Sequence, residues 1–272
     1  MRCATESSTV SIDWDRRRVE IEYAWIAGPS PQAPLMVFLH EGLGSLGLWK
    51  DFPARLCQRI GFRGLVYSRP GYGRSTPRAR DEHWAPDFMH RQALDVLPAL
   101  LRVLEVDPGD NCWLFGHSDG GSIALLYAAD TRDSLSGVIA MAPHIFVETL
   151  SVESIEQTRQ TYLETDLRDK LARYHDDPDS AFWGWNDIWL SQAFRDWNIV
   201  DDIAAIACPL LAVQGTDDEY GTLEQVRGIE HVVEQTWLRE LPGCGHSPHR
   251  DNPELLIDTV SAFVAAHRAD KA

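Results

Sequence analysis

Short runs of apolar residues alternate along this chain with longer segments whose apolar residues recur at helical spacing. A continuous apolar run of four to eight residues is typical of a strand buried on both faces of a parallel sheet. We predict such strands at residues 35–39, 64–67, 112–115, 135–142, 208–213 and 236–241. We predict helices at residues 49–60, 88–106, 122–129 and 253–266. This alternation predicts an α/β fold, with a mostly parallel central sheet and helices on both of its faces.

The first strands differ from the rest. Residues 10–14 and 19–25 mix β-branched or aromatic residues with polar ones. This pattern suits two antiparallel, half-exposed strands at an edge of the sheet.

Residues 146–202 interrupt the alternation, because they contain no run that resembles a buried strand. Residues 152–175 are polar and helix-like. An aromatic stretch follows, with Phe182, Trp183, Trp185, Trp189, Phe194 and Trp197. We predict a helical cap at 146–202, inserted into a core domain formed by 1–145 and 203–272. We expect most of these aromatic side chains to anchor the cap and about two to face a substrate.

Charge and composition narrow the choice of partners. The 272 residues include 25 Lys and Arg against 41 Asp and Glu, which gives a net charge of −16. This charge disfavours nucleic acid or an anionic membrane surface as a partner. No apolar run approaches the length that spans a bilayer, and residues 1–18 are too polar for an export signal. We therefore expect a cytoplasmic protein, with its oligomeric state left open.

The cysteines indicate neither a metal site nor a disulfide framework. There are five, an odd number, and no two of them stand in a C-x-x-C spacing. Cys112 and Cys208 lie in apolar runs, where we expect small buried side chains. We expect no metal and no cofactor.

The clearest chemical pattern is one serine between glycines. Ser118 stands between Gly116 and Gly120 in a G-x-S-x-G sequence, after a strand-like run and before a helix-like one. A sharp strand-to-helix turn brings the chain so close that side chains do not fit at the two flanking positions. Such a turn exposes the serine hydroxyl and places the amide of Asp119 at a helix N-terminus, where it can stabilise an oxyanion.

A serine hydroxyl needs a base within hydrogen-bond reach, and histidine suits this role near neutral pH. His246 follows the last predicted strand, in a glycine-rich loop at the edge of the sheet where Ser118 also lies. His249 is its competitor, but we expect the segment that leads into the last helix to carry it outward. Asp217 and Asp218 directly follow the strand at 208–213 and are candidates for the carboxylate that orients the base.

Four motifs in this order resemble those of the α/β-hydrolase-fold serine hydrolases. Residues 116–120 resemble the nucleophile elbow, and 40–45 the H-G-x-x-G-S oxyanion turn. Residues 68–75 resemble the D-x-R-G-x-G-x-S segment, while 215–218 and 245–246 resemble the G-x-x-D and G-H ends of the triad. The resemblance covers nearly the whole chain and implies the α/β-hydrolase fold.

The resemblance also implies roles. Its G-x-x-D spacing makes Asp218 the acid, with Asp217 second, and the order serine, acid, histidine is that of this fold. Some relatives take the acid from the loop after the preceding strand, where Glu148 stands here. Ungapped alignment makes Gly42 the second oxyanion donor beside Asp119.

Two departures from the family pattern affect these assignments. Glu41 replaces the usual glycine of the oxyanion turn, so Leu43 is the alternative donor. Ser68 and Pro70 replace the usual aspartate and arginine of the third motif, where we expect consequences for the loop alone.

A serine nucleophile predicts acyl chemistry and excludes the haloalkane dehalogenases and epoxide hydrolases of this fold, which use an aspartate. We predict hydrolysis of a carboxylic ester or lactone of a small or medium apolar substrate, through an acyl-enzyme. An alternative is a carbon–carbon bond hydrolase of meta-cleavage products, whose acidic substrates would require a cationic anchor. Its candidates are Arg159, Arg168, Arg173 and Arg195. A ligand-binding receptor of the same fold with slow turnover is the alternative from another class.

Overall fold

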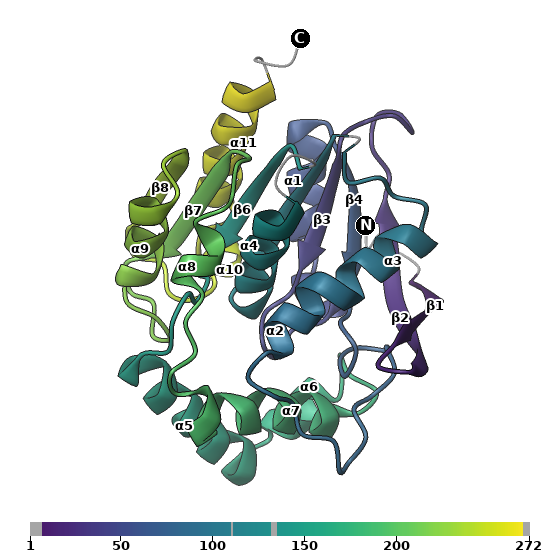
Figure 1. Ribbon diagram of the computed structural model, residues 1–272, viewed down its shortest axis with the longest axis vertical. Helices are drawn as coiled ribbons and strands as arrows, with labels where there is room; N and C mark the ends of the chain where they lie inside the picture. The colour runs from purple at the N-terminus through teal and green to yellow at the C-terminus, as the bar shows by residue number, and fades with distance from the viewer. Residues whose placement is uncertain (1–6, 110, 132–134, 269–272) are drawn as a thin grey trace.

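One sheet organises the computed structural model, which describes residues 7–109, 111–131 and 135–268. Within these residues its strand order is β1-β2-β4-β3-β5-β6-β7-β8 (Figure 1). The strands are β1 Ser8–Trp14, β2 Arg17–Ile26, β3 Leu35–Leu39, β4 Arg63–Tyr67, β5 Cys112–His117, β6 Gly137–Met141, β7 Leu210–Gly215 and β8 Thr236–Leu241. β2 is antiparallel to both β1 and β4, and all other neighbours are parallel. The predicted antiparallel edge and parallel centre are both confirmed.

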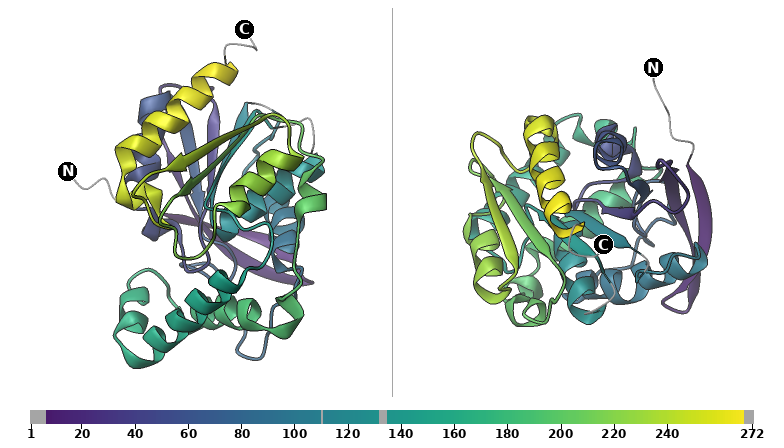
Figure 2. Two further views of the ribbon diagram at one scale, coloured as in Figure 1. Left: turned by 90° about the vertical axis from the view of Figure 1, so that its left-hand side faces the viewer. Right: turned by 90° about the horizontal axis from the view of Figure 1, so that it is seen from above.

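Two hydrophobic layers enclose the sheet. Every residue of β3 is buried, and successive side chains enter opposite layers: Met36 and Phe38 enter one, Leu35 and Val37 the other. α1 (Phe52–Ile60) and α11 (Pro253–Arg268) cover the first face. α4 (Asp119–Thr131) and α9 (Glu224–Val232) cover the second, as the left view in Figure 2 shows. The unbroken apolar pattern of β3 therefore follows from burial on both sides.

The helix predicted at residues 88–106 is irregular. It consists of α2 (Phe88–Arg91), a π-helical turn η2 (Gln92–Val96) and α3 (Leu97–Val103). Pro98 lies in the first turn of α3. Its nitrogen cannot donate a helical hydrogen bond, so the chain changes its bonding pattern just before it.

The segment 146–202 is helical, as predicted, and contains α5 (Thr149–Glu164), α6 (Leu167–Leu171), α7 (Pro178–Leu190), the 3₁₀ turn η3 (Gln192–Phe194) and the start of α8 (Val200–Ile203). Its two ends meet in a bridge between Phe146 and Asn198. α7 begins where the Asp177 side chain accepts a hydrogen bond from the Ser180 amide at 2.9 Å, with proline in the first turn.

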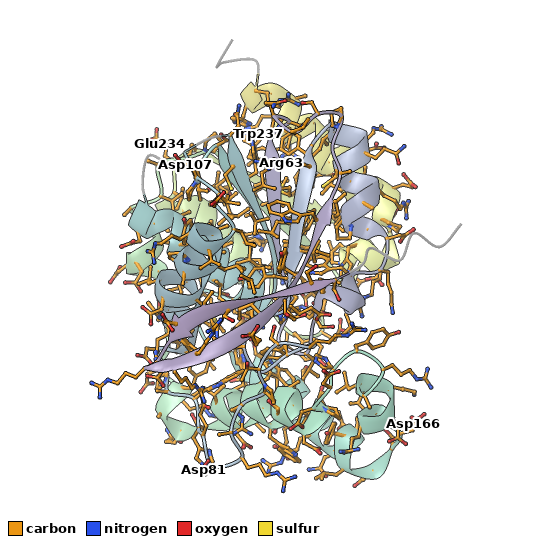
Figure 3. All side chains as sticks on the ribbon, turned by 90° about the vertical axis from the view of Figure 1, so that its right-hand side faces the viewer. Arg63, Asp81, Asp107, Asp166, Glu234 and Trp237 are labelled. Carbon is orange, nitrogen blue, oxygen red and sulfur yellow. The ribbon has the colours of Figure 1, made fainter. Side chains whose placement is uncertain are left out.

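Figure 3 shows where this segment lies relative to the strands. Arg63 and Trp237, near the starts of β4 and β8, are at the end of the molecule opposite Asp166, which lies between α5 and α6. The parallel strands thus run toward α5, α6 and α7, and their carboxyl ends face these helices (Figure 1). Functional loops of open α/β sheets lie at this edge. Among the described residues, no helix is long and apolar enough to cross a membrane.

Candidate active site

Ser118 lies on the tight turn between β5 and α4, with a left-handed φ of 53°. The two glycines of the motif are required by close backbone contacts. A Cβ atom on Gly116 would lie 2.1 Å from the Gly120 carbonyl oxygen, and one on Gly120 would lie 2.1 Å from the Leu39 carbonyl oxygen. The steric reason inferred from the sequence is therefore correct.

The structure brings together His246 and Asp218, which are 28 residues apart. Nδ1 of His246 lies 2.9 Å and 3.0 Å from the two carboxylate oxygens of Asp218. The loops are held together by close packing, because a Cβ on Gly215 would lie 2.1 Å from the Cys244 carbonyl oxygen. The imidazole therefore donates Nδ1–H to the carboxylate and leaves Nε2 free to accept a proton.

Asp218 is built to remain ionised. Its carboxylate also accepts hydrogen bonds from the Tyr220 amide at 2.8 Å and from Nε2 of Gln214 at 3.0 Å. Burial alone would raise the pKa of Asp218, but the hydrogen bond and charge interaction with His246 and the Tyr220 amide outweigh burial and lower it. Gln214 and the Tyr220 amide were not identified from the sequence.

The other acids considered lie elsewhere. Asp217 is exposed and accepts a hydrogen bond from the Thr216 hydroxyl at 3.2 Å. Glu148 accepts hydrogen bonds from the Thr222 hydroxyl, at 2.7 Å, and from the side-chain amide Nε2 of Gln225. The carboxylate that accepts a hydrogen bond from the imidazole of His246 is that of Asp218.

The expectation for His249 is wrong. Its side chain is not carried outward but is buried, with its ring centroid 5.2 Å from Trp49 and 5.0 Å from His117. α10 (Pro248–Asp251) begins immediately after the loop and turns this side chain into the core. Burial lowers the pKa of His249 to about 2, so the imidazole is neutral.

A cavity of about 250 Å³ lies beside the candidate catalytic residues. Ser118 and His246 both line it. Trp185 and Trp189 of α7 line it from the side of the helical segment 146–202. Two of the six aromatic residues of this segment thus line the cavity, and their contact with a substrate stays a prediction.

The amides of Gly42, Leu43 and Asp119 all belong to residues that line this cavity. Among the described residues, none of the three amides has a hydrogen-bond acceptor. Trp185 packs directly against Gly42, since a Cβ there would lie 2.2 Å from its Nε1. Gly42 and Leu43 therefore both remain candidates for the donor opposite Asp119.

His117, directly before the serine, was not recognised from the sequence. Its Nε2 donates a hydrogen bond to the His246 carbonyl oxygen at 2.8 Å. The turn that carries Ser118 thus holds the loop that carries His246. The signal for this role is adjacency to Ser118, which does not by itself identify a partner 129 residues away.

A buried ion pair lies behind the turn, and it was also missed. The Arg69 guanidinium lies 3.6 Å from the Asp119 carboxylate, and both side chains are almost fully buried. Arg69 also donates to the Glu41 carbonyl oxygen at 2.9 Å, while Nε1 of Trp189 donates to Asp119 at 3.2 Å. Burial raises the pKa of Asp119, although the Arg69 charge acts in the opposite direction. These contacts connect the turn at residues 40–45, the serine turn and α7.

Ser68 replaces the aspartate of the family pattern and has a role in loop structure, as expected. Its hydroxyl donates to the Glu22 carboxylate at 2.8 Å and accepts from the Leu46 amide at 2.9 Å.

Comparisons with known proteins agree with this architecture. A model of the alpha/beta hydrolase family matches residues 36–259. The sn-1-specific diacylglycerol lipase ABHD11 of Mus musculus is 23% identical over 290 residues, which cover 97% of this chain and 91% of the lipase. The bifunctional esterase/perhydrolase DCH of Acinetobacter calcoaceticus is 25% identical over 266 residues, with 85% and 92% covered. A carboxylesterase structure from Nitrososphaera gargenis has a TM-score of 0.75 at 20% identity, covering 96% of this chain and all of that one (100%), and shows a common fold.

Proposed function

The chain belongs to the alpha/beta hydrolase family, and on this premise we propose that it is a serine hydrolase that cleaves a small carboxylic ester or lactone. Its relatives include a lipase and an esterase, which supports ester hydrolysis as the general activity. The observation that carries the proposal is the pair formed by His246 and Asp218 beside a cavity that Ser118 also lines.

In the proposed reaction, Ser118 Oγ attacks the substrate carbonyl carbon while Nε2 of His246 takes the hydroxyl proton. The tetrahedral intermediate collapses, and His246 returns that proton to the departing alkoxide. A water molecule then attacks the acyl-enzyme, again with His246 as base, and releases the acid and free Ser118. Asp218 keeps the imidazole in the productive tautomer and stabilises the imidazolium.

The negative charge on the intermediate requires hydrogen-bond donors. We assign this role to the amide of Asp119 and to that of Gly42, with Leu43 as the alternative to Gly42. Their lack of other acceptors supports the assignment. Each such donor stabilises the transition state by about 2.7–4 kcal/mol in a characterised serine protease.

We further propose that residues 146–202 act as a cap over the cavity. The walls formed by Trp185 and Trp189 support this role. A substrate that enters beneath them must be small, because the cavity holds about 250 Å³.

The charges around the cavity favour an ester over an acidic dienone. None of the four cap arginines considered as anchors lines the cavity. Among the described lining residues, Arg250 is the single arginine or lysine, and it donates to the Glu41 carboxylate at 3.1 Å. Neighbouring residues lower the pKa of Glu41 against the effect of burial, chiefly through His117 and also through Arg250, so this carboxylate is anionic. An acidic substrate would therefore meet a cation that is already paired.

The test is pre-steady-state and steady-state hydrolysis of 4-nitrophenyl butyrate by the wild type and by Ser118→Ala. We expect steady turnover that the variant loses, and labelling of Ser118 by a fluorophosphonate identified by peptide mass spectrometry. A burst without turnover would favour the slow receptor. Full activity in Ser118→Ala would refute the assignment of the nucleophile.

A further inference from the structure

His144 is a second histidine in the cavity, and the proposed reaction does not use it. It follows β6 at the carboxyl edge of the sheet and lines the cavity with Ser118 and His246. Its ring centroid lies 5.8 Å from that of His246 and 4.9 Å from that of Trp189.

The backbone of His144 is fixed to the helix that carries the nucleophile. The hydroxyl of Ser122, on the first turn of α4, accepts from the His144 amide at 3.1 Å and donates to the His144 carbonyl oxygen at 2.5 Å. Both backbone groups are thereby used, so the imidazole is presented to the cavity from a rigid support. Precise placement of this kind is what a substrate contact requires.

The imidazole is uncharged over the working range of an esterase. Burial lowers the pKa of His144 to about 3, and the neighbouring His246 adds to this effect. A neutral imidazole carries one N–H donor and one acceptor nitrogen. It neither attracts an anion by charge nor competes with His246 for protons.

The positions of the two ring nitrogens indicate where the proton lies. Nδ1 of His144 is sealed from solvent and has no hydrogen-bond partner among the described residues. A buried N–H without an acceptor is rarer and more costly than a buried lone pair without a donor. The proton therefore belongs on Nε2, the ring nitrogen that is not among the sealed and unpartnered atoms of the described residues.

We propose that His144 is a specificity residue whose Nε2–H donates a hydrogen bond to an uncharged oxygen of the substrate beyond the scissile carbonyl. The substrate class is then a small oxygenated ester, with a hydroxyl, keto or ether oxygen, and not a purely hydrocarbon one. The many polar residues around the cavity, among them Glu41, Tyr220 and Ser247, agree with an oxygenated substrate. The inference rests on the proposed esterase function.

The experiment measures kcat/KM for two matched pairs of esters. One pair differs in the acyl part, 4-nitrophenyl butyrate against 4-nitrophenyl 3-hydroxybutyrate. The other differs in the alcohol part, butyl acetate against 2-methoxyethyl acetate, followed by pH-stat. For each variant, kcat/KM for the oxygenated ester is divided by kcat/KM for the plain ester, and this ratio is divided by the wild-type ratio. The intrinsic reactivity of the esters cancels in this comparison.

In His144→Phe we expect the ratio to fall by about 3- to 10-fold in at least one pair, the effect of losing one neutral hydrogen bond. His144→Asn retains an N–H donor and should preserve more of the ratio. His231→Phe, at an exposed position of α9, is the matched control and should leave both ratios unchanged.

Unchanged ratios in both pairs for His144→Phe, or an equal loss for all four esters in His144→Phe and His144→Asn, would overturn the inference and leave the esterase proposal intact. If the wild type hydrolyses none of the four esters and a fluorophosphonate does not label Ser118, the proposed function itself fails.

Discussion

The buried pair of Arg69 and Asp119 yields the sharpest quantitative prediction. At 3.6 Å, two unit charges in an environment with an effective dielectric constant of about 20 attract by about 4–5 kcal/mol. Asp119→Asn removes the negative charge and leaves the guanidinium buried, with the Glu41 carbonyl oxygen and the Tyr72 ring, 4.7 Å away, among its other contacts. Breaking a buried pair from one side costs about 3–5 kcal/mol, and we expect this loss in the free energy of unfolding.

The opposite substitution should behave differently. Arg69→Met leaves a carboxyl group that can take up a proton, whereas an arginine cannot lose one. Because burial raises the folded-state pKa of Asp119, the folded protein binds a proton more readily than the unfolded chain does. Stability linked to this group is present at low pH and lost as pH rises through the folded-state pKa. The loss in free energy of unfolding should therefore be smaller for Arg69→Met than for Asp119→Asn at low pH. As pH increases, the loss for Arg69→Met should approach that for Asp119→Asn.

Urea denaturation between pH 5 and 8, followed by tryptophan fluorescence and circular dichroism, measures these differences. Asp130→Asn is the control, since Asp130 lies on the same helix with an exposed side chain. The double variant should lose less free energy of unfolding than the sum of the two single losses. Each substitution removes the charge that the other substitution leaves unpaired. If the free energy of unfolding of Asp119→Asn lies within about 0.5 kcal/mol of the wild-type value, as it does for ordinary surface variants, the reasoning is refuted.

Four further predictions concern the serine turn, the acid (two of them) and a thiol. Gly120→Ala should destabilise the fold by about 1–3 kcal/mol or more and reduce activity, because its Cβ would lie 2.1 Å from a backbone oxygen of β3; wild-type stability in urea would contradict this. Asp218→Asn should lower kcat by about 10⁴-fold, as loss of the triad acid does in a serine protease, whereas Asp217→Asn should change it less than threefold; equal effects in ester assays would remove the distinction between them. Since the pKa of Asp218 is below its usual 3.8, its contribution to stability should be lost only as pH falls below that value, and acid titration of Asp218→Asn should lack this loss. Cys57, whose pKa burial raises to about 12, should resist iodoacetamide at pH 8 until urea unfolds the protein, as peptide mass spectrometry would show.

The sequence by itself determined the fold class and singled out the candidate site residues. Unbroken apolar runs identify strands buried on both faces, because such strands have no polar face. The serine turn could be predicted because its two glycines are required by close backbone contacts. Such local contacts place the glycines at a fixed spacing from the serine. Local geometry of this kind leaves a local pattern.

Only the tertiary structure decided which side chains meet across loops. The contact of His117 with the His246 carbonyl and the pairing of Arg69 with Asp119 join segments far apart in sequence. No sequence pattern around His117 or Arg69 identifies its partner. The direction of the His249 side chain depends on where α10 begins. The residue types of the preceding turn do not determine that point. The same holds for His144, which acquires its place in the cavity from the packing of β6, α4 and α7 around it. Spacing along the chain records local sterics and periodicity, while contacts between distant loops depend on how the whole sheet and its helices pack.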